Sequence, residues 1–503
     1  MLIRYLFSYL EDRLLDKNPN MQTLFQRITA ELSEIKTGKV YLKELMMNSL
    51  PLVIYSFATN IILTLNFHYV GKFGDQYMLA GVGLGNTWIW ATNSAIIVGL
   101  NIGTLTLCSQ ALGAKEYRIA GLTLHRAIAM RFLAFIPCYF LLYISESVFL
   151  LWGADQRIAT YASQYCRYQF IPLICMIIFD TTKSLLLANG IFMPFLYMQV
   201  CMTAVHWMAC SYLTPSLGVM GVCYAMITSY LISILLLVVY VKWKEPCKES
   251  FFKPCSESLQ GIFPQLKQEL PIGSMFYLDV MAFEGSVIIA GQFPPNELSA
   301  QVVSWNVIGT TFLPILGLMM SLTSALGNAM GEKNFIKAKN FRNAGILYAL
   351  IVITLESPCI HIFRESIIAI YTNDIEVVTT ALPLVSFFAF CIFGDFMQAT
   401  NLTILKAIGK EKLAFKINFF SNYCLGLPIG YIFGVVFGLH DIGLWIGICT
   451  GLYFGFFVSV WALFTTDMKE QVEIIQERLN EKRGLDEKLI QETEPAIEMI
   501  TYA

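Results

Sequence analysis

GAKEYRIA at residues 113–120 and GEKNFIKA at residues 331–338 are two versions of one polar segment, and about 220 residues separate them. The same offset relates SESVFLLWGAD, which begins at Ser145, to RESIIAIYTND, which begins at Arg364. Similarity at a long and constant offset is the signature of an internal repeat. The chain is therefore predicted to consist of two halves with one architecture.

The composition outside these segments is that of a membrane protein. Of the 503 residues, 56% are hydrophobic and only 14% are charged, which is too apolar for a soluble globular protein. The formal net charge of −2 argues against nucleic acid as a partner, because a phosphate-binding surface needs an excess of Lys and Arg.

Apolar windows of about twenty residues, the length that crosses a bilayer, recur along the chain. Polar or turn-rich segments separate twelve of them. They begin near Met47, Leu79, Ile119, Tyr161, Phe192, Gly218, Leu270, Leu298, Ala338, Val377, Leu413 and Ile442. Six spans per half is an even number, so both halves enter the membrane in the same direction, and we expect an axis along the membrane normal to relate them.

Basic residues gather in alternate connections, and this bias sets the orientation of a membrane protein. With the N-terminus inside, the outer connections contain only Lys72, Arg157 and Arg364. The inner ones contain Lys115, Arg118, Lys242, Lys244, Lys248, Lys253, Lys267, Lys333, Lys337, Lys339, Arg342, Lys406, Lys410, Lys412 and Lys416. Both termini are therefore predicted to be cytosolic. The protein is expected in the plasma membrane or in a vacuolar or vesicular membrane.

The predicted fold is an all-α membrane protein with twelve transmembrane helices in two six-helix lobes related by a pseudo-two-fold axis. Its parts are a cytosolic arm (1–44), the first lobe (45–243), a cytosolic linker (244–265), the second lobe (266–466) and a polar cytosolic tail (467–503). Such a design places a cavity between the lobes, as alternating access requires. The tail has apolar residues at helical spacing, which favours an amphipathic helix lying on the membrane or free in the cytosol.

Several segments, in this order, resemble the multidrug and toxic compound extrusion (MATE) family in its eukaryotic branch. They are VGKFGDQYMLAGVGLG from Val70, TLCSQALGAKEY from Thr106, LPIGSMFYLDVMAFEGSVIIAG from Leu270, ALGNAMGEKN from Ala325, FGDFMQATNLTILKAIGKEKLAFKIN from Phe393 and LGLPIG from Leu425. The resemblance implies a V-shaped central cavity and export of amphipathic, often cationic organic compounds driven by proton entry.

The chain departs from the family pattern at positions that bear on the substrate. Val280 follows Asp279 where relatives usually have Trp, and Lys406 stands where they usually have Arg. Val53 and Trp90 occupy positions that are often polar. The drug profile of better-known relatives is therefore not transferred.

Ionisable residues inside spans require an explanation, because each costs at least about 2.5–3.5 kcal/mol at the bilayer centre. Asp279 and Glu284 are five residues apart, which separates their side chains by about 140° around a helix. One is expected to face the central cavity, and the other the interior of the second lobe with Asp395 and Gln398. The resemblance implies functional acids at Asp279, Glu284 and Asp395.

These three acids are predicted to couple transport to protons. Poor hydration favours the neutral form of a carboxyl group, so that it exchanges protons near cellular pH. A cationic substrate and protons would compete for Asp279 or Glu284, while Asp395 links helix packing to protonation. The alternative is that the acids only satisfy polar groups between helices. Asp180 and Lys183, at i and i+3, are interpreted as a structural pair. Arg131 is also interpreted as structural, as a basic side chain near the cytosolic end of its span that can reach toward the interface.

Polar and aromatic residues of the second and eighth spans are the other candidates for the cavity wall, since aromatic faces attract organic cations. Tryptophan near a span end also forms interfacial belts, which is the alternative for those rings. With Gln398 of the tenth span, the candidates are Asn86, Trp90, Asn93, Trp305 and Asn306.

No enzyme motif is present, and no cofactor is expected; the coupling ion is H⁺, with Na⁺ as an alternative. The expected partners are small organic substrates and membrane lipids, and the chain is expected to be a monomer. A flippase for a lipid-linked or polyisoprenoid substrate is the rival function, and would need a cationic cavity. The thirteen cysteines lie mostly in apolar runs and are interpreted as small core residues.

Overall fold

The computed structural model describes the backbone of residues 19–372 and 374–501, and the side chains of residues 38–255, 257–372 and 374–484. Its elements are helices, so the predicted all-α fold is confirmed. Among the described residues, eleven helical segments are long and apolar enough to cross a membrane. The 25-residue helix α9 lies between two of them in the chain and completes six crossings in each half.

Ten of the twelve predicted spans begin within a helix of the structure, and the other two, at Phe192 and Gly218, begin one residue before α9 and α10. The first half contains α2 (Pro19–Phe73), α3 (Gln76–Ile89), the π-helical turn η2 (Trp90–Ser94), α4 (Ala95–Gly113), α5 (Tyr117–Tyr143), α6 (Ser145–Leu151), α7 (Gln156–Tyr168), α8 (Phe170–Ala188), α9 (Met193–Leu217) and α10 (Val219–Lys244). The connection contains two short 3₁₀ turns, η3 (Lys248–Ser250) and η4 (Ser256–Ser258). The second half contains α11 (Ile262–Ala290), α12 (Pro295–Thr311), α13 (Leu313–Gly331), α14 (Phe335–Ile368), α15 (Ile375–Ala407), α16 (Glu411–Phe419), η5 (Phe420–Gly426), α17 (Leu427–Tyr431), η6 (Ile432–Val436) and α18 (His440–Thr465), followed by α19 (Met468–Thr501).

The repeat is present in the backbone as well as in the sequence. Lys115 and Lys333, which follow α4 and α13, both have positive φ angles, 63° and 61°. Gly218 and Gly438 occupy the equivalent turns before α10 and α18, with φ of 56° and 70°. A non-glycine residue with positive φ is uncommon, so its recurrence at matched positions is specific. The two halves end and restart their helices in the same way.

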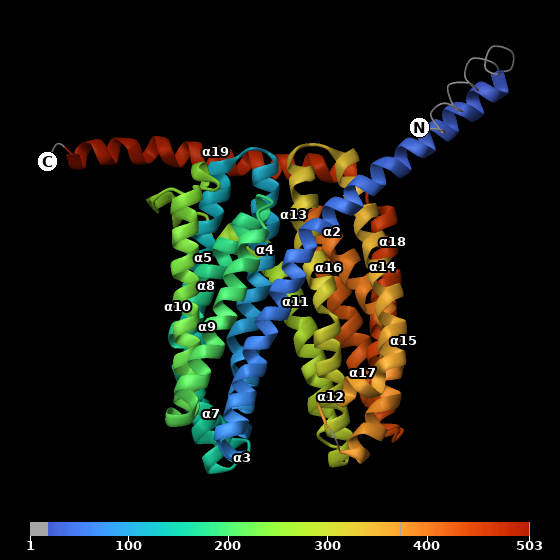
Figure 1. Ribbon diagram of the computed structural model, residues 1–503. Coiled ribbons are helices and arrows are strands. Elements are labelled where there is room, and N and C mark those ends of the chain that lie inside the picture. Colours follow the sequence, from blue (N-terminus) through green and yellow to red (C-terminus); the bar gives the residue numbers. More distant parts are fainter. Residues whose placement is uncertain (1–18, 373, 502–503) are drawn as a thin grey trace.

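The halves meet at the end of the bundle that carries both α19 and the beginning of α2, and their ribbons diverge toward the other end (Figure 1). Glycines make this contact possible. A Cβ atom on Gly113 would lie 2.2 Å from the backbone oxygen of Asn328, and one on Gly331 would lie 2.2 Å from that of Gln110. The backbones of α4 and α13 therefore touch, as small residues allow between membrane helices. We call this contact the seam.

Two crossed hydrogen bonds add specificity to the seam. Gln110 of α4 donates through Nε2 to the carbonyl of Ala407, at the end of α15, over 3.0 Å. Asn328 of α13 donates through Nδ2 to the carbonyl of Ala188, at the end of α8, over 2.7 Å. The last carbonyls of a helix have no partner within it, so each lobe satisfies one in the other. The two bonds obey the pseudo-two-fold relation.

The C-terminal helix α19 crosses the same end of the bundle (Figure 1). Its apolar residues Met468, Val472, Ile475 and Leu479 are buried in the main hydrophobic core. The amphipathic helix is therefore confirmed, but the expectation that it lies on the membrane or hangs free is wrong. The apolar face is covered by the bundle itself, because the ends of α13 and α14 offer it an apolar surface.

Polar contacts tie α19 to both halves. Gln476 donates to the carbonyl of Gly331 over 2.9 Å, and Arg478 pairs with Glu411 at 3.1 Å. Arg483 reaches Glu116 of the first half at 3.5 Å. The helix thus acts as a strap across the seam.

One pair of cysteines departs from the sequence interpretation. Cys391 of α15 and Cys449 of α18 form a disulfide, although both lie in apolar runs and were expected to be small core residues. Adjacent helices α15 and α18 bring the two thiols together, which the spacing of 58 residues does not reveal. Cys247 and Cys255 of the connection are free thiols.

The seam predicts opposite outcomes for two Gly→Ala substitutions. Gly113→Ala pushes a methyl group into the backbone of α13 and should destabilise the protein by about 1–3 kcal/mol, the usual cost of overpacking. Gly309→Ala is the matched control, because nothing lies within 4 Å of a Cβ atom there and helix propensity favours Ala. Melting temperatures of the purified proteins measure the difference. Equal melting temperatures would contradict direct backbone contact at the seam.

Candidate functional site

Asp279 lies in the interior of the second half, in a cluster of amide side chains. Its Oδ1 accepts a hydrogen bond from Asn422 of the π-helical turn η5 over 2.9 Å. Asn422 also donates to Asn418, 3.2 Å away, and Asn418 donates to the carbonyl of Met275 over 3.1 Å. Gln398 lies at the edge of the cluster and donates to Asn418 at 3.4 Å. A chain of amides thus joins α11, α15 and α16.

Asp395 of α15 is buried beside this cluster, with 9% of the residue exposed. It lies close enough to Asp279 for the two carboxylates to interact electrostatically. Lys406, also buried, interacts with Asp279 from the end of the same helix. Asp279 therefore interacts with a second acid and with one lysine, and the three groups carry an excess of negative charge when both acids are ionised.

Glu284 has different surroundings. It is half-buried beside Trp305 of α12, whose side chain interacts with it, and the Trp305 ring stacks on Phe283 with 4.7 Å between centroids. The structure therefore places Asp279, and not Glu284, with Asp395 and Gln398. Glu284 lies on the aromatic side of α11.

The remaining cavity candidates divide between open and enclosed positions. Asn306 is exposed one residue beyond Trp305, and its amide donates to the carbonyl of Val302. Asn86 and Trp90 are partly buried. Asn93 is 1% exposed and donates to the carbonyl of Cys138 of α5, so it is enclosed within the first half.

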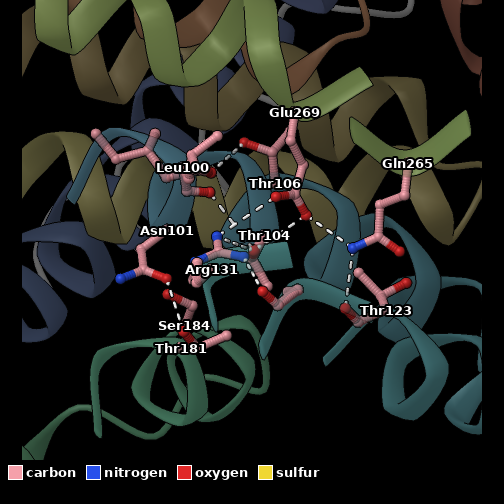
Figure 2. Close-up of polar contacts among 12 residues, drawn as sticks. Leu100, Asn101, Thr104, Thr106, Thr123, Arg131, Thr181, Ser184, Gln265 and Glu269 are labelled. Atoms are coloured by element: carbon pink, nitrogen blue, oxygen red, sulfur yellow. Dashed lines mark hydrogen bonds and ion pairs between the residues drawn. The ribbon is translucent and has the colours of Figure 1, made fainter. Parts of the chain in front are cut away.

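A buried ion pair joins the two halves next to the seam (Figure 2). Arg131 of α5 lies 3.4 Å from Glu269 of α11, and both side chains are completely buried. Arg131 also donates to the hydroxyl of Thr104 over 2.7 Å, and Thr104 donates to Glu269 over 3.1 Å. Gln265 gives Glu269 another hydrogen bond, of 2.8 Å. The interpretation of Arg131 as a side chain reaching toward the interface is therefore wrong, because its partner comes from the other half.

The equivalent position across the pseudo-two-fold axis has a neutral contact. There Ser49 of α2 donates to the hydroxyl of Tyr348 of α14 over 2.8 Å. Ser49 and Glu269 begin equivalent spans, so one architecture supports a hydroxyl pair on one side of the seam and an ion pair on the other.

Two further observations concern a charged pair in the first half and possible metal ligands. Asp180 and Lys183 form the expected pair on α8, and Lys183 also donates to the hydroxyl of Tyr55 over 2.9 Å. Among the described residues, no group of three His, Cys, Asp or Glu side chains forms a candidate metal site.

The MatE family model matches this chain twice, over residues 51–213 and 271–432. The chain belongs to the MATE family. The two matched segments are 220 residues apart at their beginnings, which is the offset of the repeat. The MATE region covers both halves but ends before α18.

Curated relatives and solved structures agree with this assignment. The chain is similar to Protein DETOXIFICATION 16 of Arabidopsis thaliana, with 25% identity over 84% of this chain and 87% of that protein. It is 25% identical to Multidrug and toxin extrusion protein 2 of Mus musculus, over 88% and 75% of the two chains. The crystal structure of the eukaryotic MATE transporter AtDTX14 superposes with a TM-score of 0.84 at 20% identity, over 88% and 99%. This fold confirms the predicted twelve-helix, two-lobe architecture.

Some of the site residues lie inside the segments that match the MATE model, and others lie outside them. Asp279, Glu284 and Asp395 lie inside the second matched segment, whereas Glu269 lies just before it. Sequence reasoning missed Glu269 because it stands one residue ahead of the apolar window that begins at Leu270. It missed Asn418 and Asn422 because an amide inside a span has many structural uses. Their i and i+4 spacing, which places both on one helix face, was the available signal.

The Arg131–Glu269 pair allows a double-mutant test. Arg131→Ala leaves a buried carboxylate without its counter-charge and should destabilise the protein by about 3–5 kcal/mol. Arg131→Ala combined with Glu269→Ala removes the uncompensated charge, so part of that loss should be recovered. Thermal unfolding of wild type, both single variants and the double variant gives the coupling energy. Additive losses would show that the two side chains do not interact.

Proposed function

We propose that this MATE-family chain is a secondary active antiporter that exports amphipathic, cationic organic compounds in exchange for protons. The observation that carries the proposal is the buried Asp279–Asp395 pair in the second lobe. The antiporter needs no resident cofactor in this scheme, and it works as a monomer. The printed names of the relatives, Multidrug and toxin extrusion protein 2 among them, support an organic substrate.

The pair suits competition between a proton and a cation. Two ionised carboxylates at close range repel each other, so that binding of a proton or of a positively charged substrate relieves the repulsion. Glu284, beside Trp305, offers a second negative charge next to an aromatic surface that suits an organic cation. Substrate and proton therefore compete for one group of acids.

The orientation follows from the basic connections. The connections that contain Lys115, Lys333 and Lys410 contact α19 through their neighbours Glu116, Gly331 and Glu411, which agrees with cytosolic termini. The membrane would be the plasma membrane or a vacuolar or vesicular membrane. With this orientation the seam lies at the cytosolic side of the membrane. Export then requires the seam to open while substrate is loaded.

A flippase for a pyrophosphate-linked lipid fits these residues less well. A pyrophosphate head group carries negative charge, which Asp279, Glu284 and Asp395 would repel. The buried Arg131 guanidinium is occupied by Glu269 at the seam.

Transport in proteoliposomes tests the proposal. Uptake of a fluorescent organic cation should follow an imposed pH gradient, and Asp395→Asn or Glu284→Gln should abolish it because each removes an exchangeable charge. Glu376→Gln, at an exposed position in the first turn of α15, is the matched control and should transport like wild type. Melting temperatures and incorporation are compared for every variant.

The same liposomes distinguish the coupling ion. If a Na⁺ gradient drove uptake while the pH was equal on both sides of the membrane, the coupling ion would be Na⁺ and not H⁺. Wild-type rates for both acid variants would exclude the assigned acids as coupling residues.

A further inference from the structure

A cavity of about 320 Å³ lies at the junction of α16, α19 and the connection that follows α15, away from the acid cluster. Its lining includes the cations Lys410, Lys412, Lys416 and Arg478, and the acid Glu411. Arg478 and Glu411 neutralise each other in an ion pair of 3.1 Å. Among the described residues, the three lysines have no acidic partner, so the cavity has an excess of positive charge.

Hydrogen-bond donors in the wall also lack an acceptor. Gln471 of α19 is 1% exposed and lines the cavity, and its Nε2 has no hydrogen-bond partner. A buried donor without a partner costs about 1–3 kcal/mol, which a ligand that accepts its hydrogen bond would recover. The first turn of α16 lies in the same wall, and no side chain caps it. The first N–H groups of a helix have no partner within it, and helix N-termini commonly bind anions for that reason.

The exposed surface of α16 indicates that this anion belongs to a lipid. Lys412 and Lys416 are exposed and one helical turn apart. Phe419 and Phe420 follow at the next turn and are 42% and 47% exposed. Along this surface the lysines come first and the exposed aromatic rings follow. A membrane lipid has the same order of groups, with its phosphate at the membrane surface and its acyl chains below. A soluble anion would gain nothing from the rings.

We propose that this cavity binds the phosphate-bearing head group of an anionic membrane lipid, in the leaflet on the side of both termini. The lysines and the Gln471 amide bind the phosphate, and the rings of Phe419 and Phe420 contact the acyl chain. The bound lipid would join α16 to α19, the strap that reaches Glu116 of the first half. Anionic lipid therefore stabilises the conformation in which the seam is closed.

Binding of short-chain lipids to the purified full-length protein in detergent tests the proposal. Dioctanoyl phosphatidic acid should bind about ten-fold more tightly than dioctanoyl phosphatidylcholine, since each interfacial lysine contributes appreciably to the attraction of anionic lipids. Inorganic phosphate tests the head group alone and should bind far more weakly than phosphatidic acid. If inorganic phosphate bound as tightly as phosphatidic acid, the cavity would be a site for soluble anions and not for a lipid. If phosphatidic acid and phosphatidylcholine bound equally tightly, the cavity would not be an anion site at all.

Two variants locate the site. Lys410→Gln, Lys412→Gln and Lys416→Gln together should remove the preference for phosphatidic acid. The control Lys253→Gln, Lys333→Gln and Lys339→Gln changes the net charge equally, at exposed positions outside the cavity, and should keep the preference. An equal loss in both triple variants would show diffuse attraction and overturn the proposal.

Gln471→Leu tests the unpaired donor without any change in charge. It should raise the melting temperature of the lipid-free protein, because an unsatisfied buried amide is removed, and should weaken phosphatidic acid binding several-fold. These opposite effects distinguish a ligand contact from a structural role. Unchanged lipid affinity would overturn the assignment of Gln471 to the phosphate.

Discussion

The architecture depends on a close contact between the backbones of α4 and α13. No side chain separates the helices at Gly113 and Gly331, and apolar burial gives little drive for association between helices that already lie in lipid. Close packing and hydrogen bonds must therefore hold the lobes together. Gln110 and Asn328 supply the hydrogen bonds, and the pseudo-two-fold relation makes the contact self-complementary. Such an interface is either formed or broken, which suits two rigid lobes that alternate between two states.

Helix α11 connects this contact to the proposed chemistry. Glu269 at its beginning is paired with the other lobe, and Asp279 in its middle belongs to the acid cluster, about 15 Å further along the helix axis. Pro271 lies between the two residues and removes one hydrogen bond of the helix, which favours bending at this point. A change of charge or hydrogen bonding around Asp279 would therefore either tilt α11 as a whole, moving Glu269 relative to Arg131, or bend the helix at Pro271. Glu269, which pairs with the other lobe, and Asp279, which belongs to the proposed coupling acids, are thus on the same helix.

Local signals in the sequence predict most of the fold. Span length, turn residues and basic connections can each be recognised within one contiguous segment. The similarity of GAKEYRIA to GEKNFIKA shows which segments of the two halves are equivalent. Asp279, Glu284 and Asp395 could be found because a carboxylate in a span is rare. Long-range partners could not: the distance in sequence from Arg131 to Glu269, or from Cys391 to Cys449, contains no information about contact. The docking of α19 escaped prediction because an apolar helix face suits a membrane and a protein surface equally well.

The difference between Ser49–Tyr348 and Arg131–Glu269 gives the seam two unequal edges. Separation of the hydroxyls breaks one hydrogen bond between neutral groups, whereas separation of Arg131 from Glu269 also removes the Coulomb attraction between two completely buried charges. The two edges of this two-fold architecture are therefore chemically unequal: α2 and α14 meet through a neutral contact, and α5 and α11 meet through an ionic one.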